Sequence, residues 1–438
     1  MAMKVTKFGG SSMADAGQFQ KVREIIRADA ARKFVVPSAP GKRFIGDEKV
    51  TDLLYLCFAK ADQGLDYSDT FQQIADRYLS IEKDLALKTN IRLELDAIYK
   101  DIENGASQDY IASRGEYLCG ILLADFLGFE FVDASELICF HSDGTYDDET
   151  TQNWTQRLEG KQNIVVPGFY GRKRDGNIKT FSRGGSDITG AIVARAAHAD
   201  VYENWTDVSG FLMADPRIVE DPKVIRIVTY SELRELSYMG ATVLHEDSIF
   251  PVRRAHIPIN VRNTNKPEEE GTMVIPDSYL KYYQREGVLT GIAGKTGFTV
   301  ITVFKDNMQN EIGFGYRLLR VLDRYNVSFE HVPSGIDTMS LVISDEKLKE
   351  HLESVLREIQ RDCEPKSIEL HSNMALIATV GKGMVRSVGV SAKLFTALCG
   401  AGVNVRMIDQ GSSEMNIIVG VESDDFKTAV RAIYNAFK

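Results

Sequence analysis

Lys4-Val5-Thr6-Lys7-Phe8-Gly9-Gly10-Ser11-Ser12 forms, near the start of the chain, an expected strand that leads directly into a glycine pair and two hydroxyl residues. Glycines let backbone N–H groups surround phosphate oxygens, and Lys7 supplies the mobile positive charge that phosphoryl transfer needs. The spacing is not G-x-x-x-x-G-K-[ST], so it does not indicate a P-loop fold. Taken alone, the stretch fits a glycine turn with a solvated lysine equally well.

A second glycine pair, Gly184-Gly185, precedes a helix of small residues expected over 191–199. Arg183 and Asp187 flank this pair. An arginine can bind a carboxylate through two hydrogen bonds, a helix N-terminus favours anions, and an aspartate can fix a neighbouring lysine or metal. The second turn therefore agrees with the first in predicting a site for anionic ligands.

Residues 1 to about 285 alternate short β-branched strands with helical stretches, which is typical of an α/β domain with a mostly parallel sheet. Directly after the strand expected at 201–205 come Thr206 and Asp207, and Asp215 and Arg217 follow shortly afterwards. In open α/β sheets ligands bind at the carboxyl ends of the strands. The expected strands are 4–7, 34–37, 130–133, 163–167, 201–205 and 259–262.

An internal repeat occupies the C-terminal part of the chain. A shift of 76 residues lays the segment from Phe298 onto the segment from Met374 without a gap. Each copy has the pattern βαββα, and copy one adds a strand near 367–370, whereas copy two ends with its helix. The strand-like stretch 287–294 is otherwise unassigned, so we expect it to fold back and complete copy two. The two modules would then be nested, with copy one at about 297–372 and copy two at about 373–438.

The composition predicts a soluble globular protein that acts on small molecules. The chain has 438 residues, a formal net charge of −10 and 44% hydrophobic residues, which is enough for about three domains. No uncharged stretch approaches the ~18 residues of a membrane span, and no signal peptide is evident, so we expect a cytoplasmic location. The five cysteines lack metal-site spacing, so no metal site is expected. A Lys/Arg tract is also absent, which argues against nucleic acid as a partner.

Six motifs occur in the order seen in aspartate kinases, and the C-terminal repeat resembles their tandem ACT regulatory modules. The motifs are K-F-G-G-S-S (7–12), V-x-S-A-x-G with V-T-D-L-L (36–41 and 50–54), S-R-G-E (113–116), F-S-R-G-G-S-D (181–187), W-T-D-V-x-G with D-P-R (205–210 and 215–217) and G-A-x-V-L-H (240–245). The resemblance implies an amino-acid kinase fold, in which helices sandwich a mostly parallel sheet, followed by two ferredoxin-like βαββαβ ACT modules. It also implies a catalytic domain at 1–285 and a regulatory region at 286–438.

The resemblance further implies transfer of the γ-phosphoryl group of ATP, bound with Mg, to the side-chain carboxylate of L-aspartate, giving 4-phospho-L-aspartate. Lys7 would span the transferring phosphoryl group and its acceptor, and Asp187 would hold that lysine. The implied aspartate-binding residues are Ser38, Thr51, Glu116 (for the ammonium), Arg183 and Ser186. The implied nucleotide-binding residues are Lys7, Gly9, Gly10, Ser11, Thr206, Asp207, Asp215 and Arg217, and the implied effector residues are Met308, Glu311, Gly313, Phe314 and Glu330.

As an aspartate kinase, the chain would catalyse the first step toward lysine, threonine and methionine, and lysine or threonine or both would inhibit it. The resemblance implies a homodimer formed through the ACT modules, with a tetramer as a further option. A glutamate or acetylglutamate kinase shares the strand-Gly-Gly start, but S-R-G-E, F-S-R-G-G-S-D and the paired ACT modules disfavour it. Because the sequence ends after the second module, we do not expect a fused homoserine dehydrogenase.

Three departures from the family pattern stand out. Thr242 replaces the usual phosphate-binding lysine, which motivates an alternative function as a catalytically impaired amino-acid sensor. His245-Glu246 replaces the usual His-Pro, and Phe211-Leu212 replaces an expected tyrosine. An insertion-like loop, 42–49, contains two lysines and an arginine. One interpretation is that these residues replace the missing positive charge; the other, which we favour, is a solvated loop, because charged loops usually face water.

Overall fold

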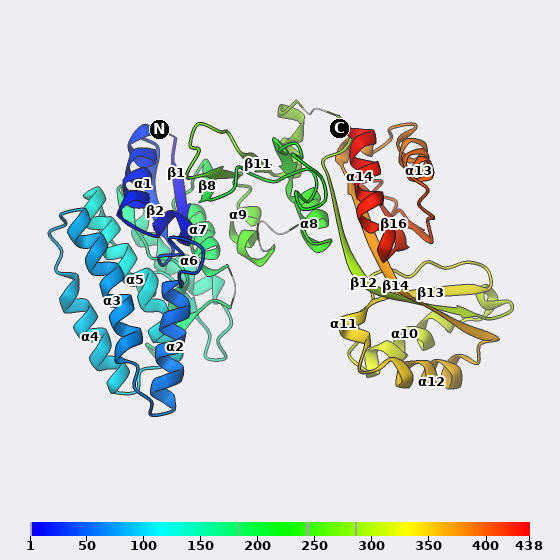
Figure 1. The fold of residues 1–438 in the computed structure, drawn as a ribbon, viewed down its shortest axis with the longest axis horizontal. Helices are drawn as coiled ribbons and strands as arrows, with labels where there is room; N and C mark the ends of the chain where they lie inside the picture. Colours follow the sequence, from blue (N-terminus) through cyan, green and yellow to red (C-terminus); the bar gives the residue numbers. More distant parts are fainter. Residues whose placement is uncertain (1, 183, 242–243, 245, 285–286) are drawn as a thin grey trace. The chain divides into compact units, whose positions relative to one another are not determined.

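The structure is a computed structural model that describes residues 2–182, 184–241, 244, 246–284 and 287–438 (Figure 1). The chain forms two compact units. The N-terminal unit contains 1–211, 224–230 and 242–284, and the C-terminal unit contains 212–223, 231–241 and 285–438. Two short segments from before residue 285 thus belong to the C-terminal unit.

An eight-stranded sheet forms the centre of the N-terminal unit. Its strand order is β3-β5-β2-β1-β8-β10-β11-β9. The inner pairs are parallel, and only β10 and β11 pair antiparallel. Phe8 at the end of β1 lies opposite Pro37 of β2 and Trp205 of β8, so the three carboxyl ends meet at one edge. The strands are β1 (Lys4–Phe8), β2 (Arg32–Pro37), β3 (Glu130–Phe131), β5 (Ile164–Val165), β8 (Val201–Thr206), β9 (Ile227–Thr229), β10 (Ile259–Asn263) and β11 (Thr272–Ile275).

Helices cover both faces of this sheet. Phe8 packs into an apolar core with residues of the five helices α1 to α5, which stand together in Figure 1. The next residue back, Lys7, reaches α7 (Gly185–Ala196), which therefore covers the opposite face, since successive strand side chains alternate. The five helices are α1 (Ala16–Ala28), α2 (Val50–Asp62), α3 (Ser68–Asp84), α4 (Ile91–Glu103) and α5 (Gln108–Leu127). A small sheet of β4 (Cys139–Phe140), β6 (Tyr170–Lys173) and β7 (Ile178–Thr180) adds to this unit.

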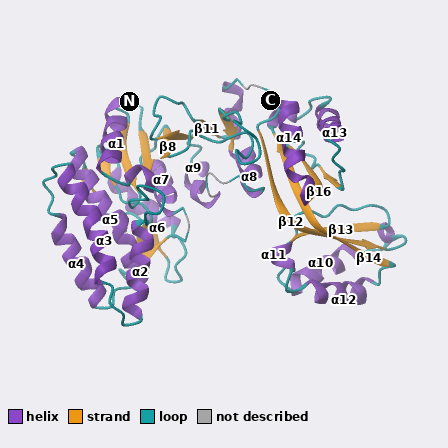
Figure 2. Cartoon of the chain, in the orientation of Figure 1, coloured by secondary structure: helices purple, strands orange, loops and turns teal. Residues whose placement is uncertain are grey.

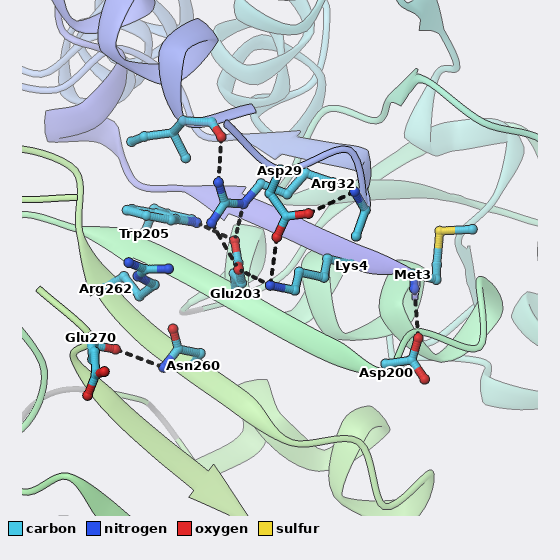
Figure 3. A network of polar contacts seen from close by, with 12 residues as sticks. Met3, Lys4, Asp29, Arg32, Asp200, Glu203, Trp205, Asn260, Arg262 and Glu270 are labelled. Atoms are coloured by element: carbon cyan, nitrogen blue, oxygen red, sulfur yellow. Dashed lines mark hydrogen bonds and ion pairs between the residues drawn. The ribbon is translucent and has the colours of Figure 1, made fainter. Parts of the chain in front are cut away.

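A buried ion network ties the three central strands together behind their carboxyl ends (Figure 3). Glu203 on β8 accepts hydrogen bonds from Arg32 Nε of β2 at 2.7 Å and from Trp205 Nε1 at 2.9 Å, and it lies 3.3 Å from Lys4 Nζ of β1. The guanidinium groups of Arg32 and Arg262 both lie over the indole of Trp205. Trp205 lies near the carboxyl end of β8, and these charged groups hold its indole in place in addition to packing.

Two long antiparallel strands, β12 (Gly291–Phe304) and β14 (Ser367–Val380), run through the C-terminal unit (Figure 2). The second half of β12 pairs with β13 (Thr338–Ser344), whereas the second half of β14 pairs with β16 (Asn416–Glu422). Gly291 at the start of β12 lies opposite Val380 of copy two. The two repeat copies therefore share both strands, and the predicted nested α/β architecture is confirmed; the strand begins at 291 and is continuous with the first strand of copy one.

Each copy places two helices on this shared sheet. Copy one contributes α10 (Phe314–Arg324) and α12 (Leu352–Cys363), and copy two contributes α13 (Val390–Gly400) and α14 (Phe426–Phe437). The edge strand of copy two is β15 (Met407–Asp409). Among the described residues, no helix is both long enough and apolar enough to cross a membrane.

Candidate active site

Lys7 and Asp187, the two predicted catalytic residues, are in contact. Lys7 Nζ lies 2.6 Å from Asp187 Oδ1, and the lysine is buried. β1 carries Lys7 to the loop edge of the sheet, and the first turn of α7 presents Asp187. Asn204 Nδ2 on β8 donates to the same Asp187 oxygen at 2.8 Å. The position of the lysine ammonium is thus set by two neighbouring elements.

The first glycine turn packs tightly against the end of β2. Gly9 N–H donates to Trp205 O at 2.9 Å, and Ser38 N–H donates to Phe8 O at 2.9 Å. A Cβ added to Gly9 would lie 3.6 Å from Lys7 Nζ, so the missing side chain leaves room beside the ammonium group. Ser11 lies in the short helix Gly10–Met13 that follows. A lysine ammonium beside a glycine without a side chain, at the edge of the sheet, suits a bound phosphate.

The second glycine turn meets a segment that the sequence analysis did not single out. A Cβ added to Gly185 would lie 2.6 Å from Phe169 Cδ2, and one added to Gly168 would lie 2.6 Å from Ser186 Cβ. Phe169 has a φ of 80°, which is rare for a bulky residue and typical of functional sites. The only sequence signal was the Gly168-Phe169 pair after a strand. Arg183 lies outside the described residues.

Glu116 is a fully buried carboxylate on α5. Burial raises the pKa of Glu116 to about 8, and hydrogen bonding to backbone N–H groups such as that of Ala39, together with the charge of Lys7, only partly offsets this effect. One of its oxygens, Oε2, is buried without a hydrogen-bond partner among the described residues. A buried acceptor left unsatisfied is costly unless a ligand completes it. Glu116 therefore suits a cationic ligand group.

The other predicted aspartate-binding residues occupy three elements around the same edge. Ser38 follows β2, Thr51 lies in the first turn of α2, and Ser186 lies in the first turn of α7. The structure thus brings Lys7 and Asp187 together and sets Ser38 beside the first glycine turn.

The predicted nucleotide residues divide between the two units. Thr206 ends β8, and its hydroxyl donates to Asp207 Oδ1 at 3.2 Å. Asp215 and Arg217 belong to the C-terminal unit, where Arg217 Nη2 lies 2.7 Å from Asp215 Oδ2. The hydrogen bond from Arg217 holds the pKa of Asp215 below its ordinary value. Thr242 and His245 lie outside the described residues.

The predicted effector residues of copy one are either in the core or already paired. Met308 and Phe314 are buried in the core of copy one, and Gly313 caps α10 with a φ of 81°. Glu311 lies 2.9 Å from Lys305 Nζ and also pairs with Arg317.

Glu330 likewise has partners within the C-terminal unit. It accepts a hydrogen bond from the Tyr238 hydroxyl, and its Oε1 lies 3.2 Å from Lys347 Nζ. Tyr238 is the last residue of α8 (Tyr230–Tyr238). An effector ammonium would meet Glu330 already paired with a lysine.

The loop 42–49 is exposed to solvent, as predicted, at every residue except Asp47. Arg43 Nε donates to Asp47 Oδ2 at 2.8 Å, so its charge is committed within the loop. Asp47 itself is buried, whereas Phe44 and Ile45 at the tip are exposed.

A cavity of about 510 Å³ in the N-terminal unit was not predicted from the sequence. Phe140, Tyr146 and Phe181 pack against one another in its wall, with ring centroids 4.9 to 6.4 Å apart. Its lining includes Ser182 but neither Lys7 nor Glu116. No periodicity or motif marks these aromatic residues as neighbours.

Comparisons with known proteins identify the family. Residues 2–263 match the amino acid kinase family model, and residues 377–437 match an ACT domain model. The chain is 38% identical to aspartokinase 3 of Bacillus subtilis, over 99% of this chain and 98% of that protein. The crystal structure of Clostridium acetobutylicum aspartate kinase is similar with a TM-score of 0.90 and 52% identity, with full coverage of both chains.

Two ligand-bound structures of aspartokinase III from Escherichia coli are also similar to this chain. Its structure in complex with aspartate and ADP is similar with a TM-score of 0.73 and 26% identity, over 99% of both chains. The same enzyme in complex with lysine and aspartate gives a TM-score of 0.71, with the same identity and coverage. The family model agrees with the sequence relatives and with the fold, and the last two extend over the whole length: this chain belongs to the amino acid kinase family and, within it, to the aspartate kinases.

Proposed function

We propose that the chain transfers the γ-phosphoryl group of ATP to the side-chain carboxylate of L-aspartate, giving 4-phospho-L-aspartate. The contact between Lys7 and Asp187 at the meeting point of the two glycine turns carries this proposal. The Escherichia coli relative, solved with aspartate and ADP, supports the choice of ligands.

Lys7 would stabilise the charge that develops during transfer. The transferring group is shared by two anions in the transition state, so a fixed cation between them lowers the barrier. Asp187 and Asn204 hold the ammonium in place before the substrates arrive. No covalent enzyme intermediate is needed, because positioning and electrostatics carry this chemistry.

The first glycine turn suits the phosphates of ATP, since a side chain at Gly9 would occupy the space beside Lys7 Nζ. Bound with the nucleotide, Mg²⁺ would neutralise phosphate charge; such ions usually keep several waters and take one or two carboxylates. Asp207 and Asp187 are the carboxylates on this edge. Among the described residues, no group of three or more His, Cys, Asp or Glu could hold a metal.

Glu116 would bind the ammonium of aspartate, because its buried Oε2 has no other partner among the described residues. Arg183 would bind a carboxylate of the substrate, with Ser38, Thr51 and Ser186 completing the pocket. Asp215 and Arg217 are assigned to the nucleotide from the motif alone.

The ACT modules would bind an amino-acid inhibitor, and we propose lysine first. The support is the lysine complex of the Escherichia coli relative and the carboxylate of Glu330. The enzyme would act at the first step toward lysine, threonine and methionine in the cytoplasm, as a homodimer joined through the ACT modules. Thr242 favours the alternative of an impaired amino-acid sensor, but the Lys7–Asp187 pair favours catalysis.

The test is ADP release, coupled to a reporter enzyme, with aspartate as acceptor. Lys7→Met should lower kcat roughly 10²- to 10³-fold, since it removes charge stabilisation made mainly in the transition state. Lys33→Met, on the neighbouring strand, is the control and should leave kcat unchanged. Near-normal turnover in a folded Lys7→Met variant would refute the role of Lys7. A wild-type chain that binds lysine without releasing ADP would establish the sensor instead.

A further inference from the structure

Arg77 on α3 is a buried arginine with four acceptors and no place in the motifs described above. Its side chain is 5% exposed. Nη1 donates to Gly41 O at 2.8 Å and to Ala14 O at 3.4 Å, and Nη2 donates to Asp47 Oδ2 at 2.8 Å and to Glu48 O at 3.4 Å. One guanidinium therefore joins three segments that are distant in sequence from α3.

Gly41, the first of these acceptors, is locked against the first glycine turn. Gly41 N–H donates to Gly10 O at 2.8 Å. A Cβ on Gly41 would lie 2.7 Å from Gly10 C, so the two backbones are in direct contact. The carbonyl of Gly41 faces Arg77 while its N–H faces Gly10. A shift of Arg77 would therefore be transmitted to Gly10 through a single residue.

The same segment also touches the proposed aspartate pocket. A backbone N–H of Ala39 hydrogen-bonds Glu116, and Val50 N–H, at the start of α2, donates to Pro40 O at 3.1 Å. Thr51 follows in that first turn. The stretch from Ala39 to Gly41 thus connects the glycine turn, the buried carboxylate and the α2 terminus.

Asp47 supplies the counter-charge that lets Arg77 be buried. Hydrogen bonding from Arg43, together with the charge of Arg77, holds the pKa of Asp47 well below its ordinary value, so Asp47 is ionised. The inserted loop 42–49 therefore has a defined structural role: it folds back and places a carboxylate against Arg77. A lysine has a single ammonium and cannot span Gly41 O and Asp47 in the forked geometry of a guanidinium.

We propose that Arg77 is a positioning residue for phosphoryl transfer, which holds Gly41 and thereby sets the phosphate-binding backbone of Gly10. The proposal rests on the proposed function for the role of Gly10. Its direct consequence is nucleotide affinity, which is measurable even if the acceptor is not aspartate.

The experiment compares Arg77→Met, Arg77→Lys and Arg77→Ala with Arg92→Met, an exposed arginine of α4, in the full chain. Calorimetric titration with ATP and Mg²⁺ gives Kd, and the ADP-release assay gives kcat and both KM values. Arg77→Met should weaken ATP binding and lower kcat by about tenfold to a hundredfold, since small misplacements near the reacting groups cost this much. The KM for ATP should rise more than the KM for aspartate.

Two further readouts separate positioning from general destabilisation. Guanidinium ion at low millimolar concentration should restore part of the ATP affinity of Arg77→Ala and leave Arg92→Met unchanged. Asp47→Asn keeps the hydrogen bond from Arg77 to Gly41, so it should lose less ATP affinity and less kcat than Arg77→Met. This variant also tests the proposal if the Arg77 variants do not fold. Folded Arg77→Met with wild-type ATP affinity, or Asp47→Asn with equal effects on both KM values, would overturn the proposal. Wild-type ATP binding without aspartate turnover would instead count against the proposed function.

Discussion

Aspartate binding should release a proton from Glu116. With a pKa of about 8, the free site is roughly nine-tenths protonated at pH 7, whereas pairing with an ammonium requires the carboxylate. Ionising it at pH 7 costs about 1.4 kcal/mol, since one pKa unit corresponds to about 1.36 kcal/mol. At pH 9 this cost is nearly absent. The Kd for aspartate should therefore fall about tenfold between pH 7 and pH 9.

Calorimetric titrations with aspartate in phosphate and in Tris at pH 7 would measure the proton release, because the two buffers differ in ionisation enthalpy. About 0.9 proton per aspartate is expected at this pKa. Glu116→Gln is neutral throughout, so it should bind more weakly and release no proton. The reasoning fails if wild-type Kd is constant from pH 7 to pH 9, or if Glu116→Gln keeps the tenfold change.

The raised pKa of Glu116 also makes the stability of the fold depend on pH. The pKa of Glu116 is raised in the folded state from an ordinary 4.5 to about 8. Its stabilising contribution is therefore complete below about pH 4.5 and is lost as the pH rises through 8. Without ligand, Glu116→Gln should melt at a higher temperature than wild type at pH 9, with little difference at low pH.

Two further predictions concern the C-terminal unit. Lys347 Nζ lies 3.2 Å from Glu330, so Lys347→Met should free that carboxylate and lower the inhibitory concentration of lysine roughly threefold. Glu330→Ala should raise the inhibitory concentration without changing uninhibited kcat. The exposed Lys349→Met is the control, and unchanged inhibition in both Lys347→Met and Glu330→Ala would contradict the assignment. Ile312 is 97% exposed, so Ile312→Glu should increase the monomer fraction in size-exclusion chromatography with light scattering if the ACT modules form the dimer, and an unchanged mass would place the interface elsewhere.

Features that depend on periodicity and local chemistry could be predicted from the sequence. The strand predicted before Gly9 is present as β1. The 76-residue repeat lacked one strand in copy two, which was enough to predict nesting. Contacts such as that between Arg77 and Gly41 could not be predicted, because nothing in the sequence of α3 distinguishes this arginine from a surface arginine. The positive φ of Phe169 was equally hidden, since a bulky residue there gives no signal of left-handed backbone.

Some predicted roles depended on partners that only the fold supplies. Glu330 remains a predicted effector residue, but its partner Tyr238 could not be predicted, because Tyr238 comes from a segment that precedes copy one by about 60 residues and belongs to the same unit. Loop 42–49 is exposed as predicted, except at Asp47. The partner that buries Asp47 could not be predicted, because it lies on a helix that begins 21 residues later.

The sharing of β12 and β14 between the ACT copies has a consequence for how this region can be altered in evolution. Because side chains alternate along a strand, a one-residue insertion in the middle of β12 would exchange the inward and outward faces of one copy relative to the other. The pairing of β12 with β14 is already irregular from Thr296 to Val300, and an irregularity of this kind accommodates an extra residue in one strand. Excising copy one would cut both continuous strands, and the first strand of copy two would have to be rejoined near residue 373. A gene can therefore lose one copy of this duplication only by rebuilding the chain connection of the other.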